Sequence, residues 1–262
     1  MTEHDAEILG VKISRVSGKE LLSAVESAVR HNERKVFAYL TVHGINLAQR
    51  LEWFREFLNK ADIVYADGAG VLLASILLGG SRIERIPLTR WIWELAGFCE
   101  KEALSVYMLG STESSVTRAA SKLCGRFPGL RVVGCHHGYF EKFDEESERV
   151  ISEINACSPH ILFVGFGMPA QEEWIQRNRE RLNVYAIFTA GSCFDFVSGA
   201  KRVCPLWFSR IGFEWLFRLF QEPRRLFIRY VVGNPTFMVR VLMQRLRHGR
   251  IHKRLDVQVT TK

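Results

Sequence analysis

The sequence predicts an α/β fold: a parallel, Rossmann-like sheet core flanked by helices, followed by a basic helical C-terminal appendage. Short runs rich in β-branched and aromatic residues recur along the first 200 residues, and most are followed by a stretch with helical periodicity. The runs are almost continuously apolar, which is typical of strands buried on both faces. After Gly199 the strand-like runs stop, and aromatic residues alternate with arginines.

The predicted strands cover residues 36–42, 63–66, 105–109, 131–135, 161–164 and 184–189. The predicted helices cover residues 47–60, 114–127, 145–156 and 170–181. In residues 47–60, for example, Leu51, Phe54 and Leu58 recur at helical spacing between charged residues. The change near Gly199 predicts two parts: residues 1–199 form the α/β core, and residues 200–262 form the appendage.

The net charge of +8 is distributed unevenly. Residues 201–262 contain 14 Lys and Arg and three acidic residues, which gives a net charge of +11. Residues 1–200 therefore have a net charge of −3. A basic, aromatic segment predicts an anionic partner, and amphipathic helices of this composition lie at membrane surfaces. Single-stranded nucleic acid is the alternative partner, but the bulky aliphatic residues and Trp favour an anionic membrane and no nucleic acid.

No uninterrupted transmembrane span is predicted. Residues 226–243 are apolar, but Arg229, Asn234, Pro235 and Arg240 interrupt them. The acidic N-terminus has no signal-peptide pattern. Six cysteines without CxxC spacing suggest reduced thiols rather than a zinc site. Together these features predict a cytoplasmic protein, peripheral on the inner face of the plasma membrane.

Four predicted strands end in small or polar residues, where a parallel sheet binds its ligands. These ends are Thr41-Val42-His43, Asp67-Gly68, Gly110-Ser111 and Gly165-Phe166-Gly167. Asp67 could serve as a general base or as a helix N-cap, and position alone does not decide between the two. Asp195 has the same ambiguity, and His43 is a candidate for ligand contact.

Residues 165–170 match GxGxxG/A, with Pro169 suited to the first turn of a helix. Such a turn can present backbone N–H groups to a phosphate. An NAD site would also require an acidic residue near the end of the following strand, which instead reads Thr189-Ala190-Gly191. A different diphosphate therefore fits better. Because no DxD pair is present, we expect a reaction that needs neither metal nor cofactor.

An ordered set of motifs between residues 36 and 229 resembles the WecG/TagA/CpsF family, glycosyltransferase family 26. The set comprises residues 61–68, 163–172 and 191–195, then Ser198-Gly199, Arg202, Pro205, Gly212-Phe213-Glu214-Trp215-Leu216 and Glu222-Pro223-Arg224. The resemblance implies an inverting transferase that moves a hexose or N-acetylhexosamine from a UDP-sugar. The implied acceptor is a saccharide on a polyprenol pyrophosphate, used in cell-surface polysaccharide synthesis.

The resemblance also implies roles for individual residues. Asp67 corresponds to the proposed catalytic base, and Thr41 corresponds to an acceptor-pocket residue. By the same resemblance Arg85 matches, Gln171 and Asp195 line the cleft, and Arg218, Arg224 and Arg225 hold the lipid pyrophosphate and the membrane. Gly110, Gly165 and Gly167 are binding candidates from their positions at the strand ends. His43 stands where the family often has Asn, and Asn46 is the candidate substitute. After Arg85, residues 86–90 depart from the family's frequent Gly and Asp.

Two other function classes stay open from the residues alone. One is an NAD-dependent oxidoreductase that uses the glycine turn at residues 165–170. The other is a non-catalytic protein that binds membrane or nucleic acid. A homo-oligomer is compatible with every one of these readings.

Overall fold

A computed structural model describes residues 4–80 and 83–259. Its centre is a parallel sheet of six strands in the order β4-β3-β8-β7-β5-β6. The strands are β3 (Lys35–Leu40), β4 (Ile63–Ala66), β5 (Ser105–Gly110), β6 (Arg131–His136), β7 (Ile161–Gly165) and β8 (Ala186–Thr189). All six predicted strands are confirmed, and their carboxyl ends lie at one edge of the sheet because every pairing is parallel.

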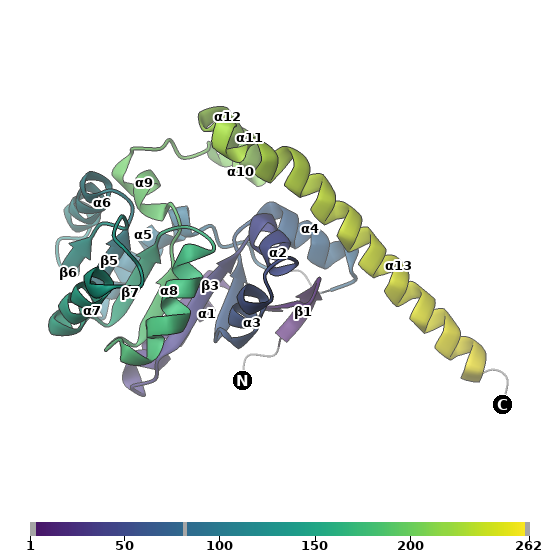
Figure 1. Cartoon of the computed structure of the whole chain (residues 1–262), viewed down its shortest axis with the longest axis horizontal. Helices are drawn as coiled ribbons and strands as arrows, with labels where there is room; N and C mark the ends of the chain where they lie inside the picture. The colour runs from purple at the N-terminus through teal and green to yellow at the C-terminus, as the bar shows by residue number, and fades with distance from the viewer. Residues whose placement is uncertain (1–3, 81–82, 260–262) are drawn as a thin grey trace.

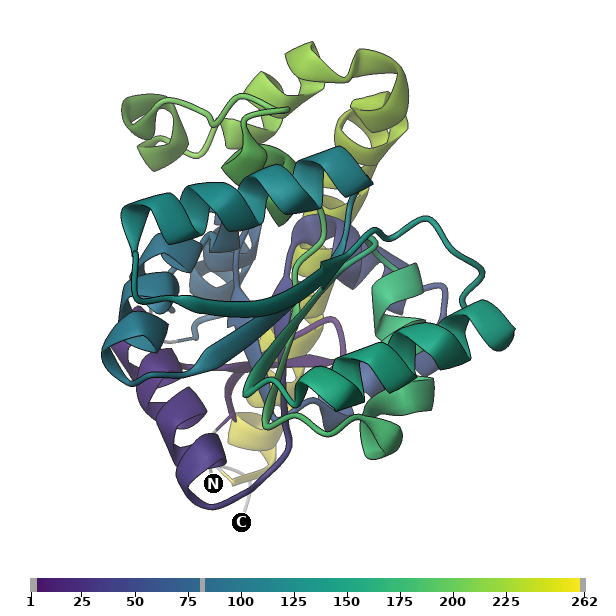
Figure 2. The same cartoon turned by 90° about the vertical axis from the view of Figure 1, so that its left-hand side faces the viewer.

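Helices cover both faces of the sheet (Figures 1 and 2). On one face, α1 (Gly18–Arg30), α5 (Leu88–Lys101), α6 (Glu113–Arg126) and α9 (Cys193–Ser198) contribute to one hydrophobic cluster. On the other face, α2 (Val42–Ala48), α3 (Glu52–Lys60), α7 (Glu145–Cys157) and α8 (Ala170–Asn178) contribute to a second cluster, together with α4 (Ala69–Leu77). The Rossmann-like core is therefore confirmed.

The predicted bounds of two helices and one strand differ from the structure. The helix predicted over residues 47–60 is two helices, because Leu51 adopts an extended backbone between α2 and α3. The first predicted strand stops at Leu40, because Thr41 turns the chain and caps α2 with its hydroxyl. Residues 179–181 leave α8 as a 3₁₀ turn, and Pro169 precedes α8 instead of lying in its first turn.

The sequence pattern did not reveal the N-terminal hairpin of β1 (His4–Ile8) and β2 (Val11–Ser14). The strands are short, and β1 is largely polar. The turn between them places Leu9 and Gly10 at positive φ, as a two-residue hairpin turn of this type requires.

The C-terminal appendage contains α10 (Leu206–Arg210), α11 (Glu214–Gln221), α12 (Pro223–Phe227) and α13 (Gly233–Val259). These helices follow the last strand of the sheet, and Figure 1 shows α10–α12 over the end of the body and α13 running along and past it. The boundaries 1–199 and 200–262 stay a prediction, and they include terminal residues outside the described ranges.

Asn234 and Pro235, which were expected to interrupt a membrane span over residues 226–243, do not interrupt the helix, because α12 continues into α13 through a π-helical turn at Ile228–Val232. Such a turn adjusts the backbone before a proline that cannot donate its own hydrogen bond. Residues 223–247 are therefore one helix that is long and apolar enough to cross a membrane, by length and composition only, among the described residues. Only 17% of its most apolar window is buried, so protein packing does not account for its apolar surface.

Candidate active site

A polar cavity of about 310 Å³ lies at the carboxyl ends of β3, β4, β5, β7 and β8. Helices α11 and α12 close it from above with residues such as Arg218, Glu222 and Arg225. A second, mainly apolar groove of about 570 Å³ lies beside it, between α4, the appendage and α13. The cavity and the groove share five lining residues, which mark where they meet: Thr41, Asp67, Arg218, Arg229 and Tyr230.

Asp67 follows β4 and lies at this junction. Its backbone N–H donates to Leu40 O at 3.0 Å, and its carbonyl accepts from Arg85 Nε at 2.7 Å. The N-cap of α4 is Gly68, with no side-chain cap, so the Asp67 carboxylate is not used for capping. The structure therefore removes the N-cap alternative, and Asp67 lines both chambers, that is, the polar cavity and the apolar groove.

The surroundings of Asp67 favour its protonated form. Burial raises the pKa of the carboxyl to about 6, and Glu214 acts in the same direction, while Arg218, Arg85 and Arg229 oppose the shift. A carboxyl with a pKa near 6 is still ionised at neutral pH, and it is a stronger base than an ordinary aspartate. These properties suit a general base.

Thr41 and His43 line the groove close to Asp67. Thr41 Oγ1 accepts from Gly44 N at 3.2 Å as the cap of α2, and Thr41 also lines the polar cavity. Burial and the nearby Arg229, Arg50 and Arg225 lower the pKa of His43 to about 4. His43 is therefore a neutral imidazole at physiological pH, able to donate and accept a hydrogen bond as an amide can.

Asn46 does not reach the site. Its Nδ2 donates to Gly233 O at 2.8 Å, and its Oδ1 accepts from Arg240 Nη1 at 3.1 Å. Both ends of the amide thus fasten α13 to α2. The hypothesis that Asn46 contacts the acceptor is not supported by this geometry.

Arg85 lies on the wall of the groove as a clamp between core and appendage. Besides the Asp67 carbonyl, it donates to Ser209 O at 2.9 Å and pairs with Glu214. The N–H donors of its guanidinium are therefore used by contacts that hold α10 and α11 beside Asp67. The structure gives it a positioning role and leaves it little capacity for direct contact with substrate.

The glycines at the strand ends allow close backbone approach. A Cβ on Gly110 would lie 2.4 Å from Gly165 O, and one on Gly165 would lie 2.8 Å from Gly191 O. Gly165 and Gly167 line the cavity, whereas Gly110 lies behind Ser111, which does. Larger residues at 110 or 165 would push apart the strand ends that form the cavity floor.

Gln171 is fully buried beneath that floor and is absent from the cavity lining. Its Oε1 accepts from Gly167 N at 3.2 Å and from Gly191 N at 2.9 Å, so it joins the loops that follow β7 and β8. Its Nε2 donates to Glu172 Oε1 at 2.7 Å. The expectation that Gln171 lines the cleft is therefore replaced by a positioning role, and the N–H of Gly167 is already occupied.

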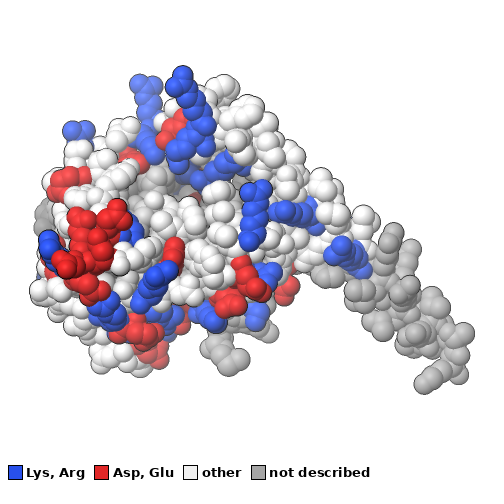
Figure 3. Space-filling view, in the orientation of Figure 1, with Lys and Arg blue, Asp and Glu red and all other residues white. Residues whose placement is uncertain are grey.

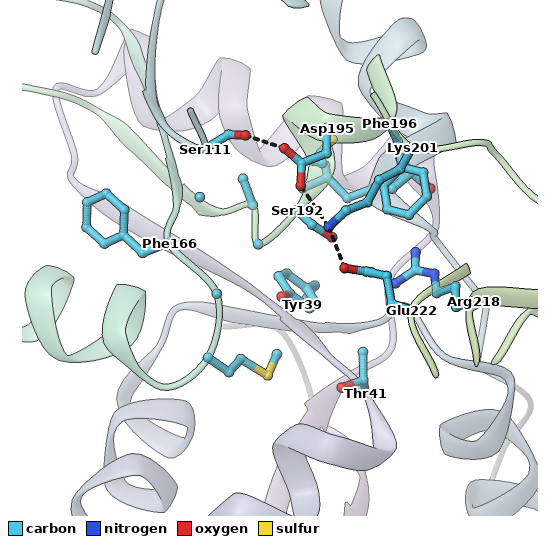
Figure 4. A pocket seen from close by; sticks show the side chains of 18 of the residues that line it. Tyr39, Thr41, Ser111, Phe166, Ser192, Asp195, Phe196, Lys201, Arg218 and Glu222 are labelled. Atoms are coloured by element: carbon cyan, nitrogen blue, oxygen red, sulfur yellow. Dashed lines mark hydrogen bonds and ion pairs between the residues drawn. The ribbon is translucent and has the colours of Figure 1, made fainter. Parts of the chain in front are cut away.

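Asp195 lines the cavity and forms part of a polar chain across it (Figure 4). Its carboxylate accepts from the Ser111 hydroxyl and pairs with Lys201 Nζ at 2.9 Å, and the same Nζ lies 3.4 Å from Glu222 Oε1. This chain links β5, α9 and the appendage. The N-cap alternative fails here too, because Ser192 holds that position in α9.

The appendage arginines differ in position. Arg218 lies at the junction, pairs with Glu214 Oε1 at 3.0 Å and stacks over Phe196. Arg225 lines the cavity and pairs with Glu222 through Nε at 2.9 Å. Arg224 is exposed and lines neither chamber, so its predicted contact with the lipid pyrophosphate and the membrane stays a prediction.

Arg229 is a site residue that the sequence analysis missed. It lines both chambers, and its buried Nε has no hydrogen-bond partner. Among residues 4–80 and 83–259 it forms no ion pair, unlike Arg218 and Arg225. The helical spacing of Arg225 and Arg229 was the available signal, since residues four apart share a helix face.

Ser111, part of the predicted strand end at residues 110–111, lines the cavity as well. Other lining residues that were not predicted as site residues include Tyr39, Ser192, Lys201, Glu222 and Tyr230. Within the described part of the chain, no group of three or more His, Cys, Asp or Glu side chains is arranged to hold a metal ion. Independence from metal stays a prediction.

The model of the "Glycosyl transferase WecG/TagA/CpsF family" matches residues 6–251. The chain belongs to this family. Membership makes it a glycosyltransferase, and it decides against the dehydrogenase and non-catalytic alternatives. The match includes most of the appendage as well as the sheet, so the residues that line the cavity and the groove fall within the matched range.

Curated relatives from Staphylococcus aureus strains MW2 and NCTC 8325 / PS 47 are similar to this chain. Each is 27% identical over 237 residues, which is 90% of this chain and 91% of the relative. Both are named N-acetylglucosaminyldiphosphoundecaprenol N-acetyl-beta-D-mannosaminyltransferase.

Proposed function

We propose that this glycosyltransferase moves an N-acetylhexosamine of the N-acetylmannosamine type, or a hexose, from a UDP-sugar to a saccharide on a polyprenol diphosphate. The main observation behind this proposal is that Asp67 lies where a polar cavity and an apolar groove meet. The cavity suits a sugar nucleotide, and the groove suits an amphiphilic acceptor. The names of the Staphylococcus aureus relatives support the same pair of substrate classes.

In the proposed reaction, the acceptor hydroxyl attacks the anomeric carbon of the donor while Asp67 accepts its proton. The bond between that carbon and the diphosphate oxygen breaks, and UDP leaves with the electron pair. One displacement inverts the anomeric configuration. A general base contributes roughly 10²–10⁴-fold.

The charge that develops on the leaving diphosphate needs fixed positive groups. Arg229 is the best candidate, because its guanidinium lines the cavity without an ion-pair partner among the described residues. Arg218 adds a second guanidinium at the junction. Preorganised donors of this kind contribute several kcal/mol to transition-state stabilisation.

The proposed location is the inner face of the plasma membrane. Figure 3 shows Lys and Arg side chains projecting at the end of the molecule formed by α10–α12. Exposed Trp207, Phe220 and Phe227 belong to the same helices. Basic and aromatic residues together attach a protein to an anionic bilayer surface, where a lipid-linked acceptor would also lie.

The test is UDP release across several UDP-sugars, with and without a short-chain, lipid-diphosphate-linked N-acetylglucosamine. We expect release with one preferred donor, dependent on the acceptor, and a product whose mass has increased by one sugar. Free N-acetylglucosamine is the control acceptor. UDP release at the same rate with and without the lipid-linked acceptor would indicate hydrolysis of the donor and contradict the proposal.

A further inference from the structure

The apolar groove continues away from the site after it leaves Asp67. One wall is α4, with Leu72, Leu73 and Ile76, and the opposite wall includes Ile211 and Phe213. Leu73, Ile76 and Ile211 are 47%, 56% and 59% exposed. Pockets of about 300–1,000 Å³ hold drug-sized ligands, so a groove of about 570 Å³ is large enough for an organic chain.

The polarity of the groove changes along its length. Asp67, Arg218 and Arg229 line the groove where it meets the polar cavity, and Arg85, Arg210 and Glu214 are its other charged lining residues. Most of the remaining lining is aliphatic or aromatic, with Leu72, Leu73, Ile76, Ile211 and Phe213 among it. A ligand matching this order has a sugar first, an anionic group second and a hydrocarbon chain third. Neither free sugar nor a sugar nucleotide has that third part.

We propose that the groove between α4 and the 211–213 segment binds the first isoprenoid units of the acceptor lipid. This inference rests on the proposed function and deepens it. The lipid is then recognised by the protein itself, and membrane attachment is not the only reason why a lipid-linked acceptor is preferred. The remaining length of the lipid leaves the groove past Leu73 and Ile76.

Continuity with the proposed catalytic site selects this occupant over a second copy of the chain. A protein partner seated in the groove would cover Asp67 and His43, because both line it. A hydrocarbon chain attached to the acceptor places its own sugar at that point. The occupant and the reacting group are then parts of one molecule.

The first experiment measures binding without turnover, in solution and without membranes. The probes are geranyl diphosphate, which carries two isoprenoid units, and inorganic pyrophosphate. Each buried CH₂ contributes favourably to transfer from water, so we expect geranyl diphosphate to bind at least about tenfold more tightly. Equal affinity for the two probes would overturn the inference.

The second experiment compares acceptors whose diphosphate carries a methyl, a geranyl or a longer isoprenoid group. For the wild type, kcat/KM is expected to rise at least about tenfold from methyl to geranyl. The double variant Leu73→Gln/Ile76→Gln should lose this rise, so that its kcat/KM differs by less than about twofold between the methyl and the geranyl acceptor. Both side chains are exposed, so the substitutions should leave folding largely intact.

Leu242→Gln is the matched control, because Leu242 is an exposed leucine of α13 outside the groove. It should retain the full dependence on tail length. A loss equal to that of the double variant would assign the effect to general surface hydrophobicity and overturn the inference. A wild type that transfers sugar equally well to all three acceptors would overturn it while leaving the proposed function intact. If none of the acceptors received a sugar, the proposed function itself would be contradicted. The binding experiment with geranyl diphosphate and pyrophosphate would still test whether the groove binds isoprenoid units.

Discussion

Replacing Asp67 by Asn should abolish transfer and, at neutral pH, make the protein more stable. The substitution keeps the size of the side chain and removes its basicity. If Asp67 is the general base, turnover should fall at least about 10²-fold. The gain in stability follows from burial, because a carboxylate whose pKa is raised costs free energy when it is ionised in the folded state.

The shift of the pKa from 3.8 to about 6 sets the size of this gain. Each pKa unit corresponds to 1.36 kcal/mol, so two units give about 3 kcal/mol as an upper value. Partial contact with solvent reduces the gain to about 1–3 kcal/mol. Below pH ~4 the carboxyl is protonated in the folded and unfolded states, so the Asn variant gains nothing. The gain grows as pH rises towards 6 and is constant above it.

The assay pairs UDP release with thermal unfolding of both proteins at pH 4.5 and pH 7.5. We expect the melting temperature of Asp67→Asn to exceed that of the wild type by a few degrees at pH 7.5, and by less at pH 4.5. Asp144→Asn is a control: Asp144 caps α7 and lines neither the cavity nor the groove, so transfer should be unchanged. More than about a tenth of wild-type turnover in Asp67→Asn would refute its role as the base, and lower stability at pH 7.5 would refute the electrostatic argument.

Three further outcomes are expected. The kcat/KM of the wild type should fall below pH ~6, because protonated Asp67 cannot accept a proton; a flat profile down to pH 5 would contradict this. In a membrane-free assay Arg229→Gln should lower kcat/KM at least about tenfold, whereas Arg224→Gln, outside both chambers, should change it less than twofold; equal effects would remove the distinction between them. Activity should survive EDTA, and loss that Mg²⁺ or Mn²⁺ restores would reveal a metal requirement.

The sheet could be predicted because its strands are short, apolar runs whose ends carry small or polar residues. Burial on both faces imposes that composition, so the pattern follows directly from the fold. The β1–β2 hairpin lacks this pattern, since β1 carries polar residues. The continuous helix through Pro235 was also unpredictable, because the compensating π-helical turn before it has no clear sequence signature.

The positions of site residues could be predicted from the sequence where they depend only on the parallel sheet. Asp67, Thr41 and Gly165 follow strands, and they lie where the parallel topology requires. Asn46 and Gln171 line neither the cavity nor the groove, because long-range hydrogen bonds to α13 and to the β8 loop use their amides. Contacts of this kind depend on how distant segments pack, and local pattern does not encode them.

The same reason explains why Arg229 was missed and Arg224 was predicted. Adjacent residues on a helix point in different directions, so only the packing of α12 and the π-helical turn decides which guanidinium enters the cavity. Arg229 interrupts an apolar run, and it was therefore read as an obstacle to membrane insertion. Its helical spacing from Arg225 carried the useful information.

The most direct test of the account is the structure of the reaction product. An α-linked UDP-sugar should be incubated with the lipid-diphosphate-linked acceptor, and the new linkage should be determined by mass spectrometry and NMR. One displacement assisted by Asp67 predicts a lipid-diphosphate disaccharide with a β linkage. A product with retained α configuration would contradict the single displacement at Asp67, and the absence of a disaccharide with every donor would contradict the proposed transfer.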